Sequence, residues 1–389
     1  MKPRSAATYL CGFYFLFYGF YGVIIPYLPV WLASRGLDQR FVGLVIASAF
    51  LPKVISAPVF AHFADAYGKH RVLIQMLLFA TLMALVSFFY AQTKAWFFSL
   101  TMAVNFFAPA ILPLMDRAAI SQQRRDGASI YTTIRLWGSL GFAVFSMAGG
   151  ILIDRAGADG VIWLGAALTL ACMVLARMSP AMGSPVTAAV HNTPDAGHAR
   201  SPLMSILRDS PVVWCIVASA LVQASNGYLY SYASLYWIAL GLETTQIGVL
   251  WTVGIASEIL LFLLARKVLA RISPVRLIML SGALTAVRWA GLGLTHDVVW
   301  MALLQVLQAF TLAGNNMAIM AFLAQRVQER SRTTAIALYT MLSAGLFMFL
   351  AINLVNLMGV SQTGAGFGVM AACALLAVPL VWHATRARQ

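Results

Sequence analysis

LMDRAAISQQRRDGASIYTTIRLWGSLGF, residues 114–142, is the stretch that decides how this chain folds. It contains the end of one apolar segment, a short basic loop and the start of the next apolar segment. Asp116 lies in the first segment and Arg135 in the second. Two helices joined by a short loop run antiparallel, so these two side chains should return to a similar depth. Ionisable side chains inside membrane helices are costly unless they pair or face water. We therefore expect both to line a polar cavity within bundled helices.

Composition places the chain among polytopic helical membrane proteins. Of its 389 residues, 61% are hydrophobic and 10% are charged, and the mean hydropathy is +0.82. Apolar runs of about 20 residues recur from end to end, which is the length that spans a bilayer. A cleavable leader is not expected, because the first apolar run continues past Trp31. All but a few of the charged residues behind the net charge of +14 fall in loops, which favours topology and anionic lipid rather than nucleic acid as the explanation of that charge.

Twelve spans are predicted, and an even number places both termini on one side. Their approximate bounds are 9–33, 41–63, 72–91, 96–118, 131–153, 161–178, 212–237, 244–265, 275–295, 298–323, 333–357 and 362–384. Most of the 26 lysines and arginines fall in loops on the side of the termini. The opposite side holds four, which are Arg35, Arg40, Lys94 and Arg155. The positive-inside rule therefore predicts cytoplasmic termini in a bacterial inner membrane.

The chain reads as a duplicated six-helix unit. The predicted domains are residues 1–178, a cytoplasmic linker over 179–211 that is rich in Pro, Gly, Ala and His, and residues 212–389. GLDQRFVGL at 36–44 matches GLETTQIGV at 241–249 with an offset of 205 residues. Such repeats occur in transporters whose halves are related by an axis along the membrane normal. Because that axis already closes the core, we expect a monomer.

Several motifs resemble a known transporter family. ADAYGKHR at 64–71, between spans two and three, resembles the loop signature of the major facilitator superfamily, although Ala66 stands where that family usually carries Arg or Lys. Within the superfamily the chain resembles the phenylpropionate permease group, which are relatives of lactose permease. The segments that carry this resemblance are GFYFLFYGFYGVIIPYLPVWL at 12–32, IRLWGSLGF at 134–142, SYASLYWIALGL at 231–242, LWTVGIASEILLF at 250–262 and AVRWAGL at 286–292.

This resemblance implies an all-α fold of two six-helix bundles and transport by alternating access. It also implies roles for residues that match the family's positions. The acid and arginine at Asp116 and Arg135 would contact substrate, as they do in lactose permease. Glu258 in span eight and Arg288 in span nine would serve proton coupling. The loop residues Asp65, Gly68, Lys69 and Arg71 would form a cytoplasmic gate.

Five ionisable residues lie within the predicted spans: Lys53, Asp116, Arg135, Glu258 and Arg288. Each costs roughly 2.5 to 3.5 kcal/mol at a helix centre, so each needs a partner or water. Asp116 and Arg135 either clamp two helices as a structural pair or contact substrate. The repeat relates Lys53 to Glu258, which predicts pairing in one conformation; the alternative is that Lys53 extends to the interface. Three bases against two acids favour an anionic substrate.

Proton coupling would lack its usual carrier in this chain, because no histidine lies mid-membrane. The phenylpropionate group often carries histidines where this chain has Asn226, Gln308 and Asn316. A symporter would therefore have to load its proton on Glu258 or Asp116, and a uniporter is the alternative.

Polar and aromatic residues in spans one, seven and ten predict the remaining wall of the cavity. Asn226, Tyr230 and Tyr236 recur at helical spacing in span seven, whereas Trp237 is assigned to the aromatic belt at the membrane interface. In span ten Gln305, Gln308 and Asn315 share one face, which should point inward. Candidate substrate contacts are Asp116, Arg135, Lys53, Asn226, Tyr230, Gln308 and Asn316, and candidate coupling residues are Glu258, Arg288 and Asp116.

The predicted function is uptake of a small aromatic carboxylate such as 3-phenylpropionate by proton symport. A sugar or nucleoside symporter and a drug-type exporter of the same fold are the alternatives, since the direction of transport is not written in the sequence. An enzyme is disfavoured because we find no metal-ligand cluster and no nucleophile motif. We expect no cofactor, no metal, and buried thiols rather than disulfides at the four cysteines.

Overall fold

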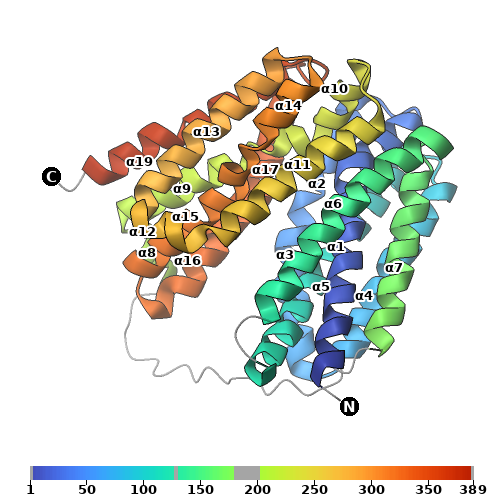
Figure 1. Ribbon diagram of the computed structural model, residues 1–389, viewed down its shortest axis with the longest axis horizontal. Coiled ribbons are helices and arrows are strands. Elements are labelled where there is room, and N and C mark those ends of the chain that lie inside the picture. The colour runs from blue at the N-terminus through green and yellow to red at the C-terminus, as the bar shows by residue number, and fades with distance from the viewer. Residues whose placement is uncertain (1–2, 127–129, 179–201, 387–389) are drawn as a thin grey trace. The chain divides into compact units, whose positions relative to one another are not determined.

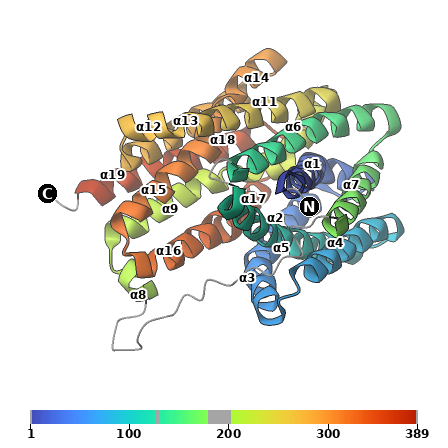
Figure 2. The ribbon, with the colours of Figure 1, turned by 60° about the horizontal axis from the view of Figure 1, so that its bottom comes forward.

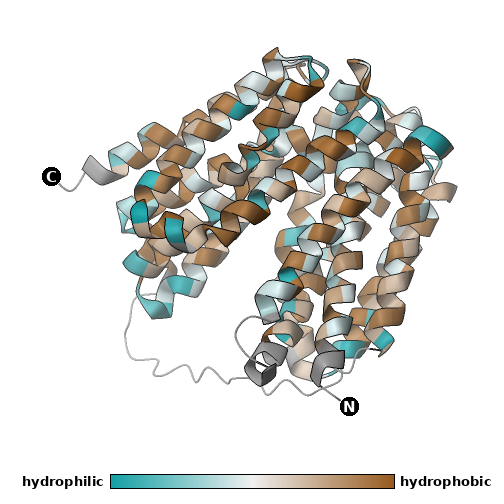
Figure 3. Cartoon of the chain, viewed as in Figure 1, coloured by the Kyte–Doolittle hydropathy of each residue, from teal (hydrophilic) through white to brown (hydrophobic). Residues whose placement is uncertain are grey.

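A computed structural model describes residues 3–126, 130–178 and 202–386 of the chain, and all regular structure in these ranges is helical. Twelve helices of the described residues are long and apolar enough to cross a membrane. Their bounds are Ala7–Ser34, Gln39–Ala64, His70–Tyr90, Lys94–Ile120, Tyr131–Ala156, Gly160–Met178, Ser210–Ala239, Thr244–Leu263, Pro274–Leu294, Val298–Arg326, Glu329–Leu357 and Ala365–Ala384. Each overlaps one predicted span, so the predicted number and order of spans are confirmed. Apolar residues run along these helices, and hydrophilic ones gather towards several helix ends (Figure 3).

The chain divides into two compact units. The first contains Met1–Ala189 and Ala233–Thr252, and the second contains Val190–Tyr232 and Val253–Gln389. Residues 233–252 therefore cluster with the first unit rather than with the chain on either side of them. Helical structure also begins inside the predicted linker, because Pro202–Leu207 forms a short helix, α8.

In the first unit, α1 is the central helix. It packs against α6 and α7, while α5 packs against α3 and α4 (Figure 1). Figure 2 shows α1 nearly end-on among its neighbours. The bounds are α1 Pro3–Ser34, α2 Gln39–Ser48, α3 Phe50–Tyr67, α4 His70–Ser87, η1 Phe88–Tyr90, α5 Lys94–Asp126, α6 Ile130–Ala156, α7 Gly160–Met178 and α10 Ser234–Ala239.

In the second unit, α13 is the central helix. It packs against α15 and α18, while α9 packs against α19. The core between these helices includes Val222, Leu277, Ile319 and Val381. The bounds are α9 Ser210–Ala224, η3 Leu229–Ala233, α11 Thr244–Leu263, α12 Ala265–Arg271, α13 Pro274–Leu294, α14 Val298–Gln305, η4 Phe310–Gly314, α15 Asn315–Arg326, α16 Glu329–Met341, η5 Leu342–Leu346, α17 Phe347–Leu357, α18 Ala365–Leu375 and α19 Ala377–Arg386.

The internal repeat has a structural counterpart at its two matching glycines. Gly36 and Gly241 both adopt positive φ, 79° and 91°, directly after a helix. Asp38 then caps α2 by accepting the N–H of Phe41 at 2.9 Å. Lys94 donates to the other oxygen of Asp38 at 2.7 Å, and this hydrogen bond lowers the pKa of that carboxyl below its ordinary value. The repeated stretch is thus a helix stop followed by a new helix start.

Glycines of α6 allow it to approach α1 closely. A Cβ at Gly141 would collide with the backbone of Phe15, and one at Gly138 would lie 2.9 Å from the ring of Tyr18. Small residues at such positions let membrane helices bring their backbones together. The α1–α6 packing places Tyr14 and Tyr18 beside the residues that begin α6.

The Gly141→Ala substitution should therefore lower stability without touching any ionisable residue. Overpacking of this kind costs about 1 to 3 kcal/mol, and we expect a lower apparent melting temperature in detergent. The matched control is Gly368→Ala in α18, where no atom lies within 4 Å of the added Cβ. Equal melting temperatures for the two variants would contradict the close approach of α1 and α6.

Candidate functional site

Asp116 and Arg135 come together in the first unit, as the short loop between their helices predicted. Nη1 of Arg135 on α6 lies 3.6 Å from Oδ1 of Asp116 on α5. Two phenols donate to the same carboxylate oxygen, Tyr14 Oη at 2.6 Å and Tyr131 Oη at 3.2 Å. The Arg135 guanidinium also lies 5.9 Å from the ring centroid of Tyr18. We call Asp116, Arg135, Tyr14 and Tyr131 the Asp116 cluster.

The Asp116 cluster is partly open. The side chains of Arg135 and Asp116 are 47% and 28% exposed. At 3.6 Å their contact is an ion pair without the two short parallel hydrogen bonds of a bidentate pair. Arg135 therefore keeps N–H groups that a ligand's carboxylate or hydroxyls can use. An acid, a guanidinium and phenols in one place suit a small molecule with both polar and aromatic parts.

Arg288 of α13 organises a second polar cluster, in the second unit. Its side chain is fully buried. Nε and Nη2 donate to Oε1 of Gln305 at 3.1 and 2.6 Å, Nη2 also donates to Oε1 of Gln308 at 2.5 Å, and Nη1 donates to Oγ1 of Thr311 at 3.3 Å. Nε2 of Gln308 then donates to Oε1 of Glu258 on α11 at 2.7 Å. We call these five residues the Arg288 network.

The network joins the predicted coupling residues through an amide. Gln308 bridges Glu258 and Arg288 with the oxygen and the nitrogen of its side-chain amide. Space for this amide comes from Gly254, where a Cβ would lie 2.7 Å from Oε1 of Gln308. The charge of Arg288 is therefore compensated by Glu258 across one neutral group.

Two donors in the Arg288 network remain without a partner among the described residues. Nε2 of Gln305 is buried and makes no hydrogen bond. Arg288 donates four hydrogen bonds, and a guanidinium carries five N–H groups, so one N–H is left over. Buried polar groups are normally satisfied, and exceptions call for an explanation. A carboxylate that entered the network would bring the kind of acceptor that these donors lack.

Departures from regular α-helix adjoin this network. The described residues include three π-helical segments, η3, η4 and η5, in spans seven, ten and eleven. Thr311 lies in η4. Tyr230 lies in η3 and interacts electrostatically with Glu258 and Arg288. Such segments are frequent at functional sites because they rotate the side chains that follow. In span ten, α14 ends at Gln305, a turn follows at Val306 and Leu307, and Gln308 lies in the helical residues between this turn and η4, which begins at Phe310.

The other predicted substrate contacts occupy different environments. Lys53 is half-buried, with its ammonium 4.2 Å from the ring centroid of Phe50. Asn226 is fully buried; its amide donates to the carbonyl of Gln223, and its Oδ1 accepts no hydrogen bond in the described structure. Asn316 is exposed, whereas its neighbour Asn315 is buried and bonded to Ser219.

The predicted gate residues lie where α3 ends and α4 begins. Gly68 ends α3 with φ of +64°, and Lys69 and Arg71 follow it, Lys69 exposed and Arg71 half-buried. The side chain of Asp65 lies outside the described part of the structure. The gate role of these four residues stays a prediction.

The assignment of Trp237 to an interfacial aromatic belt is wrong, because its side chain is fully buried.

Sequence reasoning also missed several functional candidates. Tyr131 stands four residues before Arg135, a helical spacing that could have identified it. Thr285 and Thr311, which share a 3.0 Å hydrogen bond beside Arg288, carry no comparable signal.

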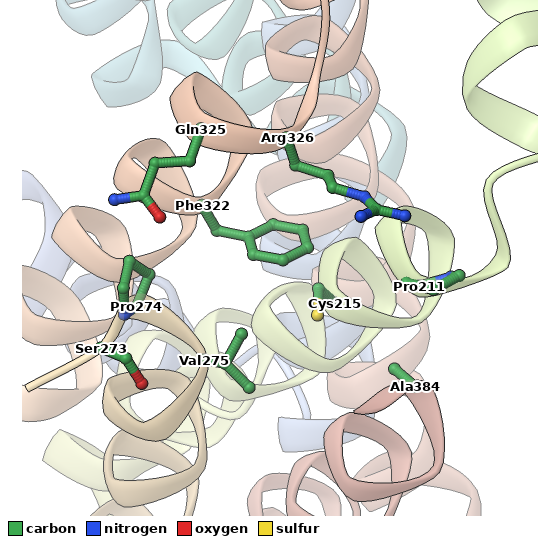
Figure 4. Close-up of a pocket in the computed structure, with 9 residues that line it drawn as sticks. All are labelled: Pro211, Cys215, Ser273, Pro274, Val275, Phe322, Gln325, Arg326 and Ala384. Carbon is green, nitrogen blue, oxygen red and sulfur yellow. The ribbon is translucent and has the colours of Figure 1, made fainter. Parts of the chain in front are cut away.

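A cavity of about 280 Å³ lies elsewhere in the second unit. The ring of Phe322 projects into it near Cys215 and Val275, and Arg326 lies at its edge (Figure 4). Arg326 is paired with Asp209, with Nε 3.2 Å from Oδ2. The cavity shares no residue with the Arg288 network, so it is not part of the candidate substrate site.

Comparisons with known proteins agree with the fold. A family model described as the MFS_1 like family matches residues 7–352. The "Probable 3-phenylpropionic acid transporter" of Escherichia coli (strain K12) is 25% identical over 314 residues, which cover 80% of this chain and 81% of that protein. The maltose permease of Geobacillus stearothermophilus is 26% identical over 339 residues, 86% of this chain and 83% of that protein. The crystal structure of the nucleoside transporter NupG matches 99% of both chains with a TM-score of 0.78 at 17% identity, which concerns the fold alone.

Proposed function

The chain belongs to the MFS_1 like family and is a multi-pass secondary transporter of the major facilitator superfamily rather than an enzyme, and from this premise we propose that it carries a small aromatic carboxylate, such as 3-phenylpropionate, together with protons. The observation that carries the proposal is the buried Arg288 with unsatisfied donors around it. A guanidinium is the side chain best suited to a planar carboxylate. The name of the relative in Escherichia coli supports the same substrate class.

Charge balance links substrate to proton. With Glu258 ionised, the Arg288 network holds one acid and one base and needs no further charge. When Glu258 takes up a proton, the guanidinium is left uncompensated in a low-dielectric interior, which is unfavourable. An entering carboxylate restores neutrality. Proton and anion would thus bind together, as symport requires, with Glu258 as proton carrier and Arg288 as anion site.

The Asp116 cluster is the substrate-binding candidate of the first unit. Arg135 offers N–H groups, and Tyr14 and Tyr131 offer phenol rings. We include Lys53, Asn226, Tyr230, Gln308 and Asn316 as further substrate contacts. The buried, unpartnered Oδ1 of Asn226 supports its inclusion. Asp116 remains a second candidate for proton binding.

We further propose that the protein acts as a monomer in a bacterial inner membrane with both termini in the cytoplasm. The strong bias of lysine and arginine towards one side of the spans supports this orientation.

At the proposed cytoplasmic gate, the Asp65→Asn substitution should slow turnover more than it weakens substrate binding. The acid, Gly68, Lys69 and Arg71 would hold neighbouring helix ends in one state and release them in the other. Uptake rate and substrate affinity measured on the same preparation check this. The control is Asp297→Asn, which makes the same chemical change at an acid that caps α14 and is not part of the proposed gate. Unchanged rate and affinity in Asp65→Asn would remove the gate role.

A neutral sugar or nucleoside is the second candidate substrate. It is favoured by the Asp116 cluster, because the carboxylate can accept hydrogen bonds from hydroxyl groups and the arginine beside it can donate to them. Competition distinguishes the two. Uncharged sugars or nucleosides that inhibit uptake, together with benzoate-like acids that do not, would favour the neutral substrate.

The experiment that tests the proposal is uptake of labelled 3-phenylpropionate into proteoliposomes, with and without an inward proton gradient. Accumulation driven by the gradient is the expected result. Uptake that only equilibrates would mean a uniporter, and an absence of uptake would return the substrate to sugars, nucleosides or exported compounds.

A further inference from the structure

One side chain of α6 caps a helix that is distant in sequence. Asp154 accepts four hydrogen bonds from the first two residues of α11. Its Oδ1 receives the N–H and the hydroxyl of Thr244 at 3.0 and 2.7 Å, and its Oδ2 receives those of Thr245 at 2.8 and 2.6 Å. A carboxylate that binds the free N–H groups of a helix start also matches the helix dipole. We call this arrangement the Asp154 cap.

Further contacts hold the same segment. Tyr27 of α1 donates to the carbonyl oxygens of Ser146 and Thr244 at 2.8 and 3.1 Å. The single hydroxyl proton of Thr244 is shared between Asp154 and the carbonyl of Gly150, each 2.7 Å from Oγ1. One helical turn further on, a Cβ at Gly248 would lie 2.7 Å from the carbonyl of Ser146.

The contacts continue along both helices, since Thr252 donates to the carbonyl of Ala143 at 3.0 Å. The start of α11 is thus bonded to α6 over two helical turns.

The position of this segment in the chain gives the cap its importance. Residues 233–252 cluster with the first unit, while the chain on either side of them belongs to the second. Any change in the arrangement of the two units must therefore either bend the chain at the ends of this segment or free it from α6. One end is the π-helical segment η3, but the other lies inside α11, which is continuous through Thr252. A continuous helix resists bending, so release from α6 is the less costly route.

We propose that Asp154 is a conformational latch, which holds residues 233–252 on α6 and α1 in the state described here and releases the start of α11 during each transport cycle. The inference rests on the proposed function, since it assumes alternating access. After release, the start of α11 still has an acid beside it. Glu243 directly precedes the helix, and its negative charge interacts favourably with the positive end of the helix dipole. The neighbouring acid Asp159 plays no such part, since it bonds to Trp31 and Arg35 of the first unit.

The test is alkylation of a cysteine at position 252 by a membrane-impermeant maleimide. Thr252→Cys is placed in a background that lacks Cys11, Cys172, Cys215 and Cys373. Adding Asp154→Ala should raise the labelling rate roughly five- to thirtyfold, the range expected for loss of a strong helix cap. Asp154→Asn keeps one acceptor and should give a smaller increase. Asp159→Asn is the matched control and should leave labelling unchanged.

A crosslink shows whether release is part of the cycle. Ala143→Cys with Thr252→Cys should form a disulfide that stops transport and that a reductant reverses. Transport that continues through the crosslinked protein would overturn the latch, as would equal labelling in Asp154→Ala and its parent. Labelling needs no substrate, so a parent that takes up no 3-phenylpropionate refutes the proposed substrate while the latch is still decided.

Discussion

Replacing Arg288 by lysine is expected to reduce the initial rate of 3-phenylpropionate uptake by more than about a hundredfold. The planar guanidinium contacts Gln305, Gln308 and Thr311 at once, and a lysine ammonium cannot reproduce that fork. Its loss leaves buried amide oxygens of Gln305 and Gln308 unsatisfied, although the lysine keeps the positive charge that compensates Glu258. Each buried acceptor left unsatisfied costs about 1 to 3 kcal/mol, and the loss of two together corresponds to about two orders of magnitude or more in binding.

The control for this prediction comes from the same helix. Arg276 lies in the first turn of α13 and is exposed, so Arg276→Lys should transport at close to the parent rate. Apparent melting temperatures of both variants separate a lost binding site from a lost fold. A stable Arg288→Lys protein with parental uptake would refute the assignment of Arg288 as the anion site.

The sequence was sufficient for those features that depend on local composition. Hydropathy located all twelve spans, because membrane helices must be apolar over a fixed length. The antiparallel return of a short loop brought Asp116 to Arg135, since no longer-range information is needed for neighbouring helices. The cost of burying charge also identified Glu258 and Arg288 as residues that must be compensated.

Other features depend on geometry that composition does not encode. Gln308 bridges Glu258 and Arg288 from a part of span ten that is interrupted on both sides, by the turn at Val306 and Leu307 and by η4 from Phe310. Asp154 caps a helix ninety residues later in the chain, and no spacing rule predicts such a pair. Trp237 was misplaced because the aromatic-belt rule considers depth along the helix and ignores which face is packed.

The Glu258→Gln substitution should abolish accumulation against a gradient while leaving exchange intact. Glutamine has nearly the same shape and can still accept the hydrogen bond from Nε2 of Gln308, but it cannot bind or release a proton. The accumulation ratio should therefore fall to about one, because coupling free energy is lost when one ligand no longer changes the affinity for the other. Counterflow of labelled against unlabelled 3-phenylpropionate, with no proton gradient, measures the exchange that remains.

Two further variants give this result its meaning. Glu243→Gln is the matched control, since Glu243 is exposed and lies directly before the same helix, and it should accumulate substrate like the parent. Asp116→Asn tests the other acid. If Glu258→Gln still accumulates substrate and Asp116→Asn does not, the proton is carried in the Asp116 cluster. The amide bridge of the second unit would then serve to neutralise Arg288 rather than to couple transport to protons.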